Sequence, residues 1–126
     1  MKLIRNLCIV ALIMIVFDTF AGVVSRHINF DYRSLMLLSN LLNIAIGYWG
    51  ASQHGFRYGI LSGAFAGLID STLGWLISIQ ISPFYIEDKT VHTFTSVLLS
   101  IIMVTAQGAF CGLVGAIIHR LLDREK

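Results

Sequence analysis

The feature that most restricts the fold of this chain is the run from Tyr58 to Ile81, in which Asp70 is the only acidic or basic side chain. As an α-helix, this run is long enough to cross the hydrocarbon core of a bilayer. The 126-residue chain is 56% hydrophobic and 13% charged, whereas soluble domains carry about 25% charged residues. We therefore expect an integral membrane protein with a single transmembrane domain over residues 1–126.

Hydrophobic segments separated by short polar connections predict an all-α bundle of four membrane helices, at about residues 7–25, 34–51, 58–81 and 93–118. The first segment has a basic start, as a signal peptide has. Asp18 would interrupt its apolar region, however, so we interpret it as the first membrane helix. The only proline, Pro83, marks the end of the third helix.

Glycines recur every four residues at the start of the third helix. Residues four apart advance by about 40° around a helix, so these glycines and Asp70 share one slowly drifting face. Small residues at this spacing let membrane helices approach closely. Packing within the chain and homodimer formation both remain open. The glycines that we expect to pack helices are Gly55, Gly59, Gly63 and Gly67, with Gly108 and Gly112 in the last helix.

Each expected helix has one polar side chain near its midpoint: Asp18, Asn43, Asp70 and Gln107. An unsatisfied polar group in hydrocarbon costs several kcal/mol, so these residues should face the bundle interior and meet one another. Interhelical hydrogen bonds contribute only about 0.6–2 kcal/mol, and Asn or Gln can supply them. An aspartate costs about 2.5–3.5 kcal/mol at a helix centre. Asp70 and Asp18 are therefore candidate proton or cation ligands, with Asn43 and Gln107 as neutral ligands.

A short internal repeat is also present. Asp18 and Gly22 have the same spacing as Asp70 and Gly74, with a hydroxyl residue following each aspartate. The second and fourth helices each carry an amide before small residues. This pattern suits two parallel helical-hairpin repeats, although such short matches also arise by chance.

Other chemical classes have little support in the sequence. Intramembrane aspartyl proteases use two membrane-embedded aspartates, but Gly67-Leu68-Ile69-Asp70 departs from their Gly-x-Gly-Asp pattern. We keep that activity as a remote alternative and otherwise expect no enzyme and no cofactor. Histidines and cysteines have no metal-ligand spacing, and the pairs His27–Asp31 and His54–His92 are best interpreted as loop residues. The net charge of +2 and the lack of a basic run argue against nucleic-acid binding.

The run from Gly47 to Gly59, Gly-Tyr-Trp-Gly-Ala-Ser-Gln-His-Gly-Phe-Arg-Tyr-Gly, continues with Gly63 and Gly67-Leu68. This pattern resembles small, uncharacterised four-span bacterial membrane proteins with a Gly/Arg turn between helices 2 and 3. The resemblance implies a four-helix fold in a bacterial inner membrane and implies no activity. The small multidrug exporters also have four short helices, but they carry a glutamate in the first one.

Lysines and arginines set the expected orientation. On one side lie Lys2, Arg5, Arg57, Arg120, Arg124 and Lys126, and on the other lie Arg26, Arg33 and Lys89. Positive residues favour the cytoplasm, so we expect both termini there. The expected function is an accessory subunit or small transporter component in a homo-oligomer or larger membrane complex. A structural or regulatory interaction protein without transport is the alternative.

Overall fold

The computed structural model describes residues 2–29, 34–81 and 93–124. These residues form helices and contain no strand. The helices are α1 (Lys2–Ile28), α2 (Leu35–His54), α3 (Phe56–Ile69), a π-helical turn η2 (Asp70–Gly74), α4 (Trp75–Ile81) and α5 (Phe94–Arg124). Four stretches are long and apolar enough to span a membrane, and the third of them, Phe56–Ile77, consists of α3, η2 and the start of α4. The prediction of a multi-pass helical membrane protein is confirmed to this extent.

The helix ends differ from the expected ones. α1 begins at Lys2 and α5 continues to Arg124, because a helix does not need to stop at its first charged residue. Long basic side chains can reach water while their backbone stays helical. The expected helix at 58–81 begins at Phe56 and contains the π turn that separates α3 from α4. The expected connection at residues 82–92 lies outside the described residues, as do residues 30–33 of the one expected at residues 26–33. The first three residues of that connection belong to α1, which ends at Ile28.

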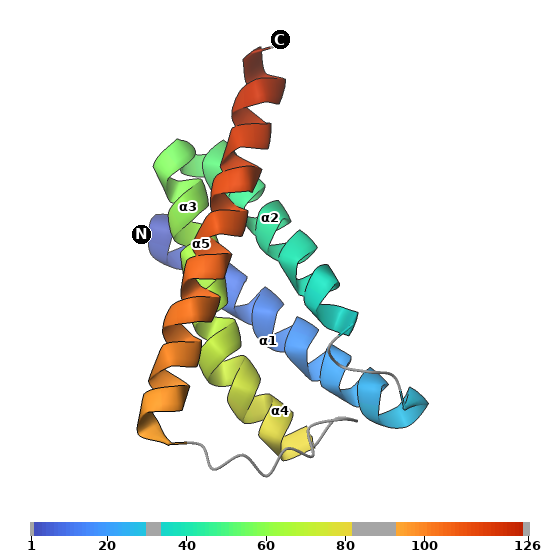
Figure 1. Cartoon of the computed structure of the whole chain (residues 1–126). Coiled ribbons are helices and arrows are strands. Elements are labelled where there is room, and N and C mark those ends of the chain that lie inside the picture. Colours follow the sequence, from blue (N-terminus) through green and yellow to red (C-terminus); the bar gives the residue numbers. More distant parts are fainter. Residues whose placement is uncertain (1, 30–33, 82–92, 125–126) are drawn as a thin grey trace.

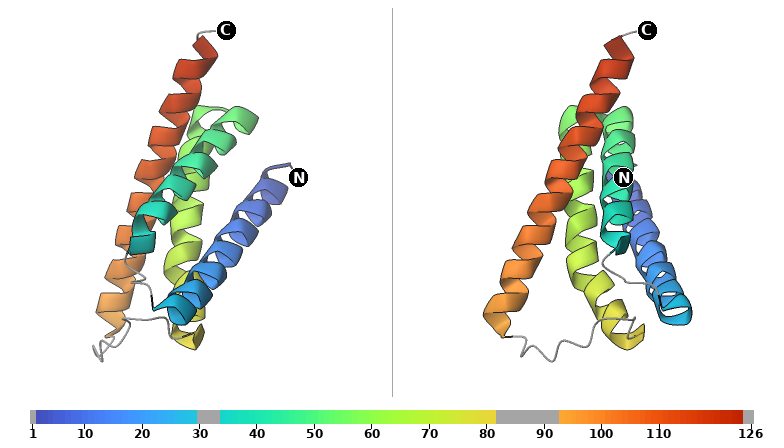
Figure 2. Two further views of the ribbon diagram at one scale, coloured as in Figure 1. Left: turned by 90° about the vertical axis from the view of Figure 1, so that its right-hand side faces the viewer. Right: turned by 45° about the vertical axis from the view of Figure 1, so that its right-hand side comes forward.

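The spans run alternately up and down, so both termini lie at the same end of the bundle (Figure 1). α5 extends beyond the other helices at that end (Figure 2). The outward surface carries large apolar side chains that suit contact with lipid, such as Leu12, Phe20, Leu37 and Ile102.

Glycines join α2, α3 and α5 into a tightly packed unit. A Cβ atom at Gly63 would lie 2.6 Å from the Cα of Gly112, and one at Gly108 would lie 2.9 Å from the Cα of Gly67. On α2, a Cβ at Gly47 would lie 2.5 Å from the Cα of Gly112. Real Cβ atoms do not come so close to backbone, so these helices touch through their main chains. The glycines of α3 are therefore occupied within the chain.

Gly55 does not belong to this packing, so its expected role as a packing glycine is wrong. It lies between α2 and α3 with φ = 94°, and no atom lies within 4 Å of the position its Cβ would take. Its N–H donates to the Ala51 carbonyl at 2.8 Å and closes the end of α2. The chain turns here through a backbone conformation that favours glycine.

α1 is less closely attached than the other spans. It packs mainly against α3, η2 and α4 and makes few contacts with α2, and Figure 2 shows it leaning away from α2. Val10 and Met14 are fully buried on its inner face. Because α3 and α5 pack along their length while α1 and α2 do not, the two hairpins differ in packing. The short sequence repeat therefore does not correspond to two alike structural halves.

Candidate functional site

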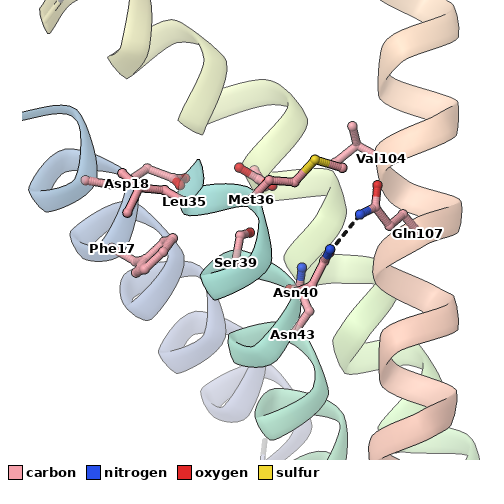
Figure 3. Close-up of a pocket in the computed structure, with 11 residues that line it drawn as sticks. Phe17, Asp18, Leu35, Met36, Ser39, Asn40, Asn43, Val104 and Gln107 are labelled. Atoms are coloured by element: carbon pink, nitrogen blue, oxygen red, sulfur yellow. Dashed lines mark hydrogen bonds between the residues drawn. The ribbon is translucent and has the colours of Figure 1, made fainter. Parts of the chain in front are cut away.

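A cavity of about 290 Å³ lies between α1, α2, η2 and α5 (Figure 3). We call it the polar cavity. Its polar lining residues are Asp18, Ser39, Asn40, Asn43, Asp70 and Gln107. Its apolar lining residues are Phe17, Ala21, Leu35, Met36 and Val104. All four polar residues singled out at the helix midpoints thus face one space.

The π turn places Asp70 on this cavity. The N–H of Trp75 bonds to the Asp70 carbonyl five residues earlier, which widens the helix by one residue at this level. The hydroxyl groups of Ser71 and Thr72 donate to the Leu68 carbonyl at 3.1 and 2.6 Å. These bonds satisfy a carbonyl where the regular α-helical pattern ends. Such π turns occur frequently at functional sites.

Asp18 and Asp70 form a carboxyl pair. Asp18 is only 2% exposed, and its carboxyl group and that of Asp70 both lie beside the position that a Cβ atom at Gly74 would take. The two acidic side chains thus meet inside the bundle, one from α1 and the other from η2.

Gly74 makes the carboxyl pair possible. A Cβ atom at this position would collide with the Asp18 carboxylate and would lie 3.2 Å from Oδ1 of Asp70. The Asp18 side chain thus rests against the bare backbone of η2. Gly22 follows Asp18 at the same spacing as Gly74 follows Asp70, but Gly22 faces the Ile81 side chain and no carboxyl group.

Two buried oxygen atoms of the cavity residues lack partners. Among the described residues, neither Oδ2 of Asp18 nor Oδ1 of Asn43 accepts a hydrogen bond. Asn43 is 3% exposed, so water does not cover its side chain. Ser39 lines the same cavity as Asp70. Leaving a buried acceptor unsatisfied costs about 1–3 kcal/mol, so these atoms mark a place where a ligand could bind.

Gln107 is paired differently from the expectation that the midpoint residues meet one another. Its Nε2 donates to Oδ1 of Asn40 at 2.7 Å, and this bond joins α5 to α2 (Figure 3). Sequence reasoning missed Asn40 because it lies outside the small-residue face of α2. Its spacing of three residues from Asn43 was the available signal.

The cavity contains two carboxyl groups. Among the described residues, Asp18 and Asp70 are the only titratable ones that line it, and none of the described lining residues is a Lys, Arg or His. The remaining polar groups offer neutral oxygen atoms and amides. This chemistry suits binding of protons or of cations that prefer oxygen ligands.

The other candidate sites have different surroundings. Nδ2 of Asn6 lies 3.1 Å from Nε2 of His54, and the His54 ring lies 5.3 Å from that of Tyr58. Within the described ranges, no group of three or more His, Cys, Asp or Glu side chains could hold a metal. Asp31 and His92 lie outside the described residues.

No protein-family model matches the chain, and no curated protein or solved structure shows significant similarity to it. The function therefore has to be argued from the polar cavity.

Proposed function

We propose that this protein is a small transporter component or accessory subunit that binds a proton or a cation in the polar cavity. One observation carries the proposal: a carboxyl pair within the membrane span faces a cavity together with unpartnered oxygen atoms. Asp18 and Asp70 would hold the ligand, and Asn43 and Gln107 would be neutral ligands. A carboxylate at this depth is costly, which is typical of residues kept for function.

The proposal also includes the membrane, the orientation and the oligomeric state of the protein. The excess of Lys and Arg near the termini supports an orientation with both termini in the cytoplasm, and the resemblance in the α2–α3 region supports a bacterial inner membrane. A unit of four spans encloses little interior volume. We therefore place it in an oligomer or larger membrane complex, which it would join through its lipid-facing surface, since the α3 glycines already pack against α5.

Flux through reconstituted protein tests this function. We expect proteoliposomes that contain the wild type to move protons or cations, and Asp70→Asn to abolish this flux without loss of folding. The amide keeps the shape of the side chain but cannot carry the charge. Asp123→Asn is the matched control, because Asp123 is an exposed aspartate at the end of α5. Wild-type protein without flux in a broad ion panel would contradict the proposal.

A structural or regulatory role is the second candidate. It is favoured by the contact of Asp18 with Gly74, which ties α1 to η2. This role requires that Asp70→Asn leaves both assembly and activity of the complex unchanged. Two adjacent aspartates are also the minimum that an intramembrane aspartyl protease needs. This remote alternative predicts that the wild type cleaves membrane-spanning peptides and that the same Asp70→Asn variant does not.

A further inference from the structure

We propose that the ligand of the polar cavity is a hard divalent cation, of the class of Mg²⁺, Ca²⁺ and Mn²⁺. This inference rests on the proposed function and specifies its ligand. It is carried by three features of the cavity: the type of donor atoms, their charge, and the two acceptors that have no partner.

The donor atoms are oxygens. Asp18 and Asp70 supply carboxylate oxygens, Ser39 a hydroxyl and Asn43 a side-chain carbonyl. Mg²⁺, Ca²⁺ and Mn²⁺ prefer such ligands, whereas Zn²⁺ and copper prefer imidazole and thiolate. The lining residues include no His or Cys, and a single thioether, at Met36, does not select a soft metal.

Two of these oxygen atoms have no hydrogen-bond partner among the described residues. Oδ2 of Asp18 comes from α1 and Oδ1 of Asn43 from α2, and both belong to side chains that are at least nine-tenths buried. Neither helix supplies a donor to these atoms within the described part of the chain. Both oxygens belong to residues that line the polar cavity, so a cation held in this cavity is the kind of ligand that would satisfy them.

Charge distinguishes a divalent from a monovalent cation. When both carboxyl groups are ionised the pair has a charge of −2, and none of the described residues that line the cavity is basic. An unpaired charge buried in a membrane protein is strongly unfavourable. One divalent cation neutralises the pair completely. A monovalent cation such as Na⁺ leaves one negative charge or requires that one proton stays.

The volume suits a partly hydrated ion. The cavity of about 290 Å³ is far larger than the space that one water molecule needs, about 30 Å³ of liquid volume. Mg²⁺ keeps several of its waters when it binds to one or two carboxylates. The protein therefore does not have to supply all the ligands itself.

Mn²⁺ binding to the full-length protein in nanodiscs tests the inference. Electron paramagnetic resonance measures the free ion. We expect one saturable site per chain, with competition by Mg²⁺ or Ca²⁺ but not by Na⁺. Gel filtration of each variant checks that it is folded.

Three variants define the site. Asp70→Asn and Asn43→Leu should each weaken Mn²⁺ binding by at least about tenfold, by analogy with the loss that follows when a partner of a metal ligand is removed. Leucine branches at Cγ as asparagine does, so Asn43→Leu removes the carbonyl without opening a hole. The control Asp123→Asn should leave the affinity unchanged.

The remaining outcomes decide separately on the divalent site and on the proposed transport function. Proton- or Na⁺-linked flux that depends on Asp70, without Mn²⁺ binding at millimolar concentration, overturns the divalent site and leaves the proposed function standing. Mn²⁺ binding that survives both Asp70→Asn and Asn43→Leu overturns it as well. Mn²⁺ binding without any flux supports this site and contradicts transport.

Discussion

At the scale of single residues, the carboxyl pair depends on the absence of a side chain at Gly74. Gly74 leaves the space in which the Asp18 carboxylate lies against η2. Gly22 has the same spacing from an aspartate but faces the flexible end of Ile81, with the nearest atom 3.3 Å from its Cβ position. The two glycines therefore tolerate an added methyl group differently.

We expect Gly74→Ala to destabilise the protein by about 1–3 kcal/mol, the usual cost of overpacking. Gly22→Ala should cost clearly less, because the Ile81 side chain can move aside. Thermal unfolding of the two variants in the same detergent measures the difference. Equal unfolding temperatures would show that the Asp18 carboxylate does not occupy the space beside Gly74.

At the scale of helices, the backbone contacts of α3 and α5 leave no room for adjustment. A methyl group at Gly112 would meet the Gly59 carbonyl oxygen at 2.6 Å and the Cα of Gly63 at 2.9 Å. Main-chain atoms cannot rotate away as a side chain can. Two helices in this contact have to move apart as whole elements, or not at all.

Gly112→Ala should therefore lower stability by about 1–3 kcal/mol. Ala106→Val is the matched control on the same helix, because Ala106 is exposed and its added bulk points outward. The midpoint of unfolding in a denaturing detergent checks both variants. The model of α3–α5 packing fails if the larger substitution at Ala106 is the more damaging one.

Comparison of sequence and structure at this scale shows what periodicity can predict. Apolar length predicts the four spans, and the cost of polar groups in hydrocarbon predicts that Asp18 and Asp70 face inward. Which amide meets Gln107 depends on the rotation of α2, and the contact between Gly47 and Gly112 restricts that rotation. The π turn at Asp70 and the positive φ at Gly55 arise from local backbone geometry that no regular spacing encodes.

At the scale of the whole molecule, α1 is joined to the rest at separate polar contacts. Near its start Asn6 meets His54, at its middle Asp18 meets Asp70, and near its end Arg26 donates to the Ile81 carbonyl at 3.1 Å. The other three spans share backbone contacts. The molecule thus consists of a rigid group of three spans and one span attached by side chains.

The proposed orientation can be tested on this whole molecule. Single cysteines at Asp123 and Ile28, in a chain whose Cys8 and Cys111 are replaced by serine, should be labelled by a membrane-impermeant maleimide from opposite sides. We expect Asp123→Cys to react only after the cytoplasmic face is opened, because the positive residues gather at that end. Labelling of Asp123→Cys in intact cells would reverse the proposed topology.

The contact between Asp18 and Asp70 also has a consequence for biosynthesis. α1 is made first, and its partner on η2 emerges only with the third span. Until then Asp18 lies in a span without its carboxyl partner, at a cost of about 2.5–3.5 kcal/mol. The first span should therefore stay near the insertion machinery until the third has been made, so that assembly of this protein is a late and concerted event.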